Sequence, residues 1–155
     1  MALLMKRTSL IVLMAFSMTA APLFAAKTTD EIVAELKSGT ETEQVEAAKA
    51  LGMAKAKAAV PDLIAALGSE STQVQAAAAA ALGAIAEKGE STAAVLKLAQ
   101  ETDNGVVRYA ALAALLELVE DEKKAEIQEV MAGQENSDDD LLSDLAVKLN
   151  EKLQK

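Results

Sequence analysis

The stretch Val60-Pro-Asp-Leu-Ile-Ala-Ala-Leu67, followed by Ala81-Leu82-Gly83, decides the fold because it recurs along the 155-residue chain. With a shift of 31 residues, Ile32, Val33, Leu36 and Leu51-Gly52 match Leu63, Ile64, Leu67 and Leu82-Gly83. The same leucine returns at Leu115 and Leu149, which gives four copies. Self-similarity at a spacing of 31 to 34 residues indicates a repeat architecture.

Each copy ends in a segment with helical periodicity, which we name helix A. Apolar positions lie eight, four and one residues before the repeated leucine, and this spacing favours one buried stripe on an α-helix. The three columns are Glu43, Val74, Val107 and Leu141; Ala47, Ala78, Ala111 and Leu145; and Ala50, Ala81, Ala114 and Lys148.

A second periodic segment, helix B, precedes each helix A. Its buried columns are Ile32, Leu63, Val95 and Ile127, then Leu36, Leu67, Ala99 and Met131. Boundary signals are Thr28-Thr29-Asp30, Ser38-Gly39-Thr40, Pro61 in a first turn, and Ser137-Asp138. The expected B helices span 29–38, 59–68, 91–101 and 123–132, and the expected A helices span 41–55, 71–87, 104–120 and 138–153. No strand pattern competes.

The pattern Val-x3-Ala-x2-Ala-Leu-Gly, read from Val74 to Gly83, resembles the short HEAT-like repeats of the phycobilisome-lyase type. The third copy is similar through Val107-Arg108-Tyr109, although Leu116 and Asn150 replace the glycine in the last two copies. The resemblance covers about residues 29 to 153. It implies an all-α, armadillo-like, right-handed α-solenoid of four helical hairpins.

The first residues are expected to be an export signal. Lys6 and Arg7 precede an apolar stretch from Leu10 to Ala21, which is too short to span a bilayer and is followed by Pro22. We expect cleavage after Ala25 or Ala26, although an uncleaved anchor is the alternative. The expected division is therefore a signal peptide over 1–25 and a solenoid over 26–155, in a periplasmic or secreted bacterial protein.

The charge of the chain limits its partners. The formal net charge is −9, and removal of residues 1–25 with Lys6 and Arg7 makes it −11. An acidic protein repels phosphate backbones and anionic lipids, so we expect a basic protein partner, no nucleic acid and no stable membrane insertion. The chain has no cysteine, so it also needs no disulfide.

Catalysis is not expected. The chain has no histidine and no cysteine, which removes the commonest general base, metal ligand and thiolate nucleophile. The acids from Glu117 to Glu122 adjoin Lys123 and Lys124 and indicate a solvated turn. Asp138-Asp139-Asp140 lacks the alternating spacing of a calcium loop and is better explained by helix capping. We therefore expect no catalytic residue, no cofactor and no metal.

The candidate partner-binding surface is the side of the B helices that faces away from the apolar stripe, because the B helices of related solenoids line the concave face. Its residues are Glu31, Glu35, Asp62, Ala66, Lys97, Glu101, Glu126 and Glu129. These residues could equally be the solvated face of ordinary helices. Arg108 and Tyr109 could anchor a partner, but we expect Arg108 to pair with a carboxylate of a neighbouring repeat and Tyr109 to pack between helices.

Three functions remain open at this point. The favoured one is an exported, non-enzymatic scaffold or adaptor for protein–protein interaction. The resemblance also implies a lyase-type or chromophore-attachment accessory factor. The third is a self-assembling structural envelope protein, because the last A helix carries Leu141, Leu145, Leu149 and Leu153, although its polar residues are typical of a capping repeat.

Overall fold

The computed structural model describes residues 27–134 and 139–154. The predicted signal over 1–25, its cleavage sites and the predicted boundary at Ser137-Asp138 lie outside these residues. Within the described ranges the chain forms eight α-helices and no strand, which confirms the all-α prediction.

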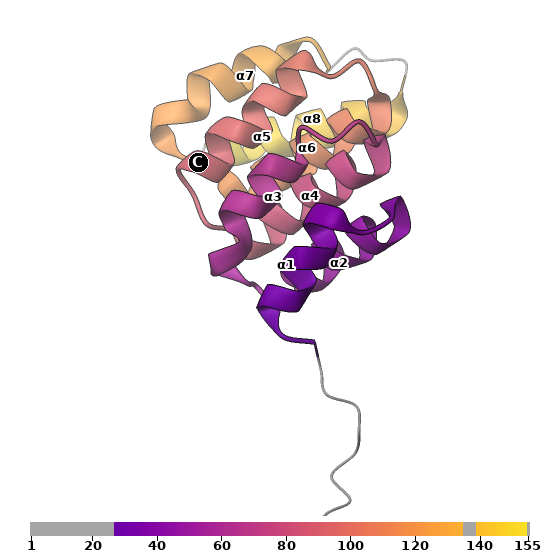
Figure 1. Ribbon diagram of the computed structural model, residues 1–155. Helices are drawn as coiled ribbons and strands as arrows, with labels where there is room; N and C mark the ends of the chain where they lie inside the picture. The colour runs from indigo at the N-terminus through magenta and orange to yellow at the C-terminus, as the bar shows by residue number, and fades with distance from the viewer. Residues whose placement is uncertain (1–26, 135–138, 155) are drawn as a thin grey trace, which may run out of the picture.

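The helices form four successive hairpins (Figure 1). They are α1 (Thr29–Ser38) and α2 (Glu41–Met53), α3 (Val60–Ala66) and α4 (Thr72–Ile85), α5 (Glu90–Glu101) and α6 (Gly105–Leu118), and α7 (Lys124–Ala132) and α8 (Asp140–Leu153). Short 3-10 turns, Lys57–Ala59 and Asp121–Lys123, precede α3 and α7.

The hairpins stack into a solenoid of two layers (Figure 1). One layer consists of α1, α3, α5 and α7, which are the B helices, and the other of α2, α4, α6 and α8, which are the A helices. Within each layer a helix contacts the equivalent helix of the next hairpin. We call these the B layer and the A layer.

The helix starts follow local sequence signals. The side chains of Thr28 and Thr40 accept hydrogen bonds from the backbone at Glu31 and Glu43, whose carboxylates accept in return from the threonine N–H groups. Two capping boxes therefore begin α1 and α2. Pro61 lies in the first turn of α3, as predicted, where its missing N–H costs no helical hydrogen bond.

The first three A helices end two residues earlier than predicted, whereas α8 ends at Leu153 as predicted. Lys55 and Ala86 adopt left-handed backbone angles, with φ of 49° and 56°, and such a residue ends a helix. Val119 leaves α6 with an extended ψ of 129°. Apolar periodicity continues past these points, so it could not reveal the ends.

The core contains the repeated leucines. Leu51, Leu82, Leu115 and Leu149 are at most 1% exposed. The column four residues earlier is also buried, as are both columns of the B layer with the exception of Ile32, which is half-buried. Alanine lets the A helices approach closely, while leucine and isoleucine supply bulk.

Two predicted stripe positions are wrong at the first hairpin. Glu43 is exposed because it forms the capping box of α2, and Ala50 is only half-buried. In the second and third copies the equivalent positions are Val74, Ala81, Val107 and Ala114, which are all buried. Among the described residues, no helix precedes α2 in the A layer to cover this side.

In α8 the predicted stripe is correct at Leu145 and Leu149 but wrong at two other positions. Leu141 is 65% exposed and Lys148 is exposed, whereas Leu142 is 4% exposed. The buried stripe is Leu142, Leu145, Ala146, Leu149 and Leu153. Leu116 and Lys148 replace the small residues that let α4 and α6 approach closely, so α8 packs on α6 with a different side of its surface.

Candidate binding surface

The predicted surface lies along the B layer. Glu31 and Glu35 are on α1, Asp62 and Ala66 on α3, Lys97 and Glu101 on α5, and Glu126 and Glu129 on α7. Glu35, Asp62 and Ala66 are half-buried and the others are exposed. Ala66 packs against the hydrophobic core, so its side chain contributes to stability rather than to an open surface.

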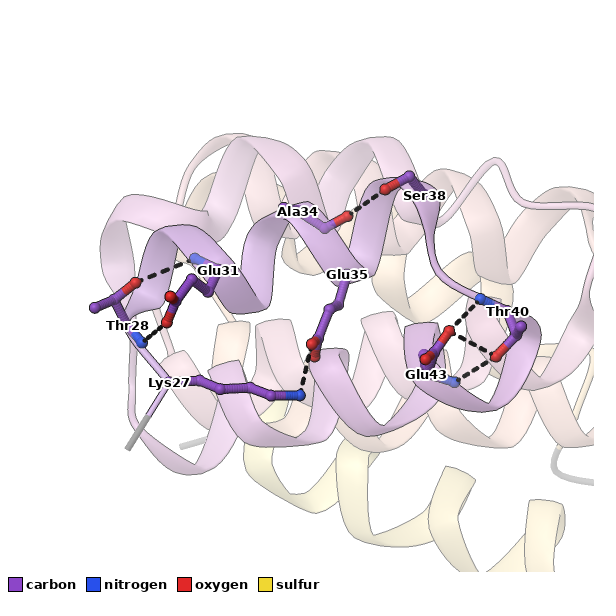
Figure 2. Close-up of polar contacts among 8 residues, drawn as sticks. All are labelled: Lys27, Thr28, Glu31, Ala34, Glu35, Ser38, Thr40 and Glu43. Atoms are coloured by element: carbon purple, nitrogen blue, oxygen red, sulfur yellow. Dashed lines mark hydrogen bonds and ion pairs between the residues drawn. The ribbon is translucent and has the colours of Figure 1, made fainter. Parts of the chain in front are cut away.

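The predicted acids of the first two hairpins are already engaged within the chain, and Figure 2 shows those of the first hairpin. The Glu31 carboxylate accepts a hydrogen bond of 2.7 Å from the Thr28 N–H. Glu35 lies 2.5 Å from the Lys27 ammonium. Asp62 of α3 pairs at 2.7 Å with Lys37 of α1, so this pair joins two hairpins.

Lysines also accompany the acids of the later hairpins. Lys97 lies 3.9 Å from Glu101 on α5, and Lys123 lies 2.8 Å from Glu126 on α7. The predicted set of six acids and Lys97 carries a charge of −5, and contact with Lys27, Lys37 and Lys123 reduces this to −2. Exposed pairs of this kind add little stability, but they weaken the field that a basic partner would meet.

The capping carboxylates titrate abnormally. The pKa of Glu31 is lowered from its ordinary value of 4.5 by hydrogen bonds from the backbone and side chain of Thr28. The Thr40 backbone and side chain lower the pKa of Glu43 in the same way. The hydrogen bond with Glu35 raises the pKa of Lys27. The carboxylates of Glu31 and Glu43 are therefore held at the helix starts by hydrogen bonds.

One pocket brings Glu129 together with Arg108. It has a volume of about 370 Å³ and lies where the ends of α5 and α7 meet the first turns of α6. Its lining residues are Ala99, Gln100, Arg108, Glu129, Val130 and Gln134. We call it the α5–α7 pocket. It combines one cation, one anion, two amides and a small apolar surface.

Arg108 does not make the predicted pair. Its guanidinium donates a hydrogen bond to the carbonyl oxygen of Thr102, the residue that caps α5, and within the described residues no ion pair joins it to a carboxylate. The expected carboxylate of a neighbouring repeat is replaced by the carbonyl end of the preceding helix, which attracts a cation. Tyr109 is 40% exposed, so the prediction that it packs between helices is also wrong.

Two other acidic segments lie at a turn and at the start of a helix. Asp121 pairs with Lys124 at 2.8 Å, and this contact lowers the pKa of Asp121. Asp139 accepts hydrogen bonds from the N–H groups of Leu141 and Leu142 and so caps α8. Asp138 lies outside the described residues. Among residues 27–134 and 139–154, no cluster of three or more acids could hold a metal ion.

The sequence did not single out Gln100, Val130 or Gln134 as pocket residues. The sequence did contain one signal for the pocket. Arg108 directly follows the buried Val107 on a helix with 3.6 residues per turn. That position lies at the edge of the buried stripe, and its equivalents Gln44 and Gln75 are also polar and half-buried. The edge position faces the junction between hairpins, where a groove can form.

Repeated helical hairpins stacked in two layers define an α-solenoid. Residues 29–130 match the family described as HEAT repeats, and the chain belongs to this family. HEAT repeats generally mediate protein interactions, so the chain is of the scaffold class. No match was found among curated proteins. In the described part of the chain, no helix is both long enough and apolar enough to cross a membrane.

Proposed function

We propose that the protein is an exported, non-catalytic adaptor that binds a protein partner on the B layer, at the surface around the α5–α7 pocket. The observation that carries this proposal is the pocket itself, because Arg108 and Glu129 meet there without an ion pair between them. Elsewhere on the predicted surface the acids are occupied by lysines or helix starts. Arginine and mixed polar groups beside small apolar residues are typical of binding hot spots.

Two sequence features support the remaining parts of the proposal. The absence of histidine and cysteine from the whole chain leaves few groups suited to catalysis. Lys6 and Arg7 before the apolar stretch support export to the periplasm or beyond. The mass of the protein recovered from a bacterial envelope fraction tests export: retention of residues 1–25 in a cytoplasmic protein would reject it.

The surface can be tested by photocrosslinking in cells. A photoreactive amino acid is placed at Lys97 or Glu126, which are exposed on the B layer, and at Lys49 or Ala80, which are exposed on the A layer. We expect a discrete adduct from the B-layer positions and none from the A-layer positions. Equal adducts from both layers, or adducts from the A layer alone, would reject the assigned surface.

Charge reversal at Glu129 is the sharper companion experiment. Reversal at Glu31 or Glu35 would also remove a capping box or the Lys27 pair, so a loss of binding there could reflect a damaged helix. Glu129 has no ion pair among the described residues. Glu129→Lys should therefore reduce crosslinking from Lys97 while the melting temperature stays close to that of the parent protein.

A second candidate function is self-association through the last hairpin, because Leu141 and Val147 of α8 are 65% and 49% exposed. Exposed apolar side chains at a solenoid end favour stacking of another copy. Light scattering distinguishes the two: a dimer that Leu141→Glu converts to a monomer would support self-association. A monomeric parent protein would leave the adaptor function as the proposal.

A further inference from the structure

The α5–α7 pocket has the chemistry of a small-ligand site as well as a place on the proposed surface. Its volume of about 370 Å³ falls at the lower end of the range of roughly 300–1,000 Å³ for small-molecule pockets. The pocket is an open depression whose volume can accommodate one or two amino-acid residues. The occupant must also match the charges of the lining residues.

Arg108 is prepared to bind an anion. Its hydrogen bond to the Thr102 carbonyl oxygen holds the side chain at the end of α5. A guanidinium group has five N–H donors arranged as a planar fork, so other donors remain for a ligand. This fork matches the two oxygens of a carboxylate and forms two parallel, charge-assisted hydrogen bonds with it.

Glu129 supplies the opposite charge in the same pocket. Many lysines of this protein pair with a carboxylate, yet within the described residues no ion pair joins Arg108 to Glu129. A ligand with a carboxylate and an ammonium group could therefore satisfy both. Gln100 and Gln134 can bind peptide N–H and C=O groups, and Ala99 and Val130 leave room for a small apolar side chain.

From this arrangement we propose that the α5–α7 pocket binds a small zwitterion made of α-amino acids, with the α-carboxylate on Arg108 and the ammonium group on Glu129. The ligand is a free amino acid or a dipeptide, which share this chemistry. This proposal goes beyond the proposed function: it gives the pocket a small ligand of its own, on the surface where the protein partner is proposed to bind.

Nuclear magnetic resonance offers a direct test, because Arg7 and Arg108 are the only arginines of the chain. The side-chain Nε–H signal that disappears from the spectrum of Arg108→Lys belongs to Arg108. Alanyl-alanine, added to the isotopically labelled full chain, should move this signal and the Gly133 amide signal saturably. Its C-terminal amide should move neither, and its N-acetyl form should bind more weakly.

Three variants assign the contacts. Arg108→Lys keeps the charge but loses the planar fork, so alanyl-alanine should bind about tenfold more weakly, as followed by the Gly133 signal. Glu129→Gln should weaken alanyl-alanine by a similar factor but leave the N-acetyl form unchanged. Glu126→Gln is the matched control, since Glu126 is on the same helix and pairs with Lys123 outside the pocket. It should bind like the parent protein.

Parallel titrations with alanine and with alanyl-alanine identify the source of the ligand. Equal binding of alanine assigns free amino acids, and binding of alanyl-alanine alone assigns a dipeptide. Absence of saturable shifts, equal binding of the amide, or unchanged binding in both Arg108→Lys and Glu129→Gln would overturn the proposal. Crosslinking from Lys97 and Glu126 is measured separately from ligand binding. The adaptor surface is therefore retained if the pocket assignment fails, and the pocket assignment is retained if the crosslinking fails.

Discussion

Gly83 of α4 lies against Ala114 of α6, so closely that a Cβ atom at Gly83 would stand 2.7 Å from the Cα atom of Ala114. One repeat earlier, Gly52 of α2 has the same relation to Ala81 of α4, at 2.9 Å. The shift between the two glycines is 31 residues, which is the repeat itself. Three A helices are therefore held at a spacing that only glycine facing alanine allows.

Gly83→Ala should destabilise the protein despite the better helix propensity of alanine. Overpacking against backbone costs about 1–3 kcal/mol, and the propensity gain returns about 1 kcal/mol. We expect a net loss of up to about 2 kcal/mol in the free energy of unfolding, measured by urea denaturation. Gly105→Ala is the control, because a Cβ there meets nothing within 4 Å. A Gly83→Ala variant as stable as Gly105→Ala would contradict the close packing.

Leu142→Ala and Leu141→Ala test which side of α8 faces the core. Leu142 is 4% exposed, so its truncation should cost about 2–5 kcal/mol, as should truncation of the fully buried Leu82. Leu141 is 65% exposed, and its truncation should change stability by less than about 0.5 kcal/mol. Thermal unfolding of the pair decides the register. If Leu141→Ala proves the more harmful, α8 is turned as the repeat spacing alone predicts.

Thr92 and Ser91 are adjacent residues with buried side chains, and we expect opposite effects on stability when their hydroxyl groups are removed. Thr92 Oγ1 donates a 3.0 Å hydrogen bond to the carbonyl oxygen of Leu118, at the end of α6. Thr92→Val should leave that carbonyl unsatisfied and cost about 1–3 kcal/mol. Ser91 Oγ has no hydrogen-bond partner in the described part of the chain, so Ser91→Ala should be neutral or stabilising. Chemical denaturation compares them, and equal losses would exclude a special role for the Thr92 bond.

The fold was predictable because apolar periodicity is a local property. Leu51, Leu82 and Leu115 each have alanine one and four residues earlier in the sequence, and all three are buried. The register of α8 was not predictable in this way. Leu141 and Leu142 are both apolar, and the spacing from Leu115 to Leu149 is longer than that between earlier copies. Only the packing of α8 on α6 decides which leucine is buried.

The candidate site was less predictable because tertiary contacts determine which of its charged side chains pair. Lys37 and Asp62 belong to different hairpins, so sequence spacing did not reveal their pair. The same holds for Arg108 and Glu129, which meet only because α6 and α7 adjoin one pocket. The role of Glu31 was within reach of the sequence, since Thr28 followed by Glu31 has the spacing of a capping box.

Glu43 should make the stability of the protein depend on pH, and this dependence can be assigned to one hydrogen-bonded helix cap. Its carboxylate accepts a 2.7 Å hydrogen bond from the Thr40 N–H, and this bond lowers the pKa of Glu43 below its ordinary value of 4.5. A carboxyl group with a lowered folded-state pKa stabilises the protein above its unfolded-state pKa. That stabilisation is lost as the pH falls through the folded-state value.

Glu43→Gln should therefore be less stable than the parent protein at about pH 6, and the difference should shrink as the pH falls below about 4.5. Urea unfolding, followed by circular dichroism across this range, measures the difference. Glu41→Gln removes the same charge from the same helical turn, and Glu41 has no side-chain hydrogen bond among the described residues. Its effect should be smaller at every pH. If the two variants follow the same pH curve, overall charge rather than the capping box governs the acid response of α2.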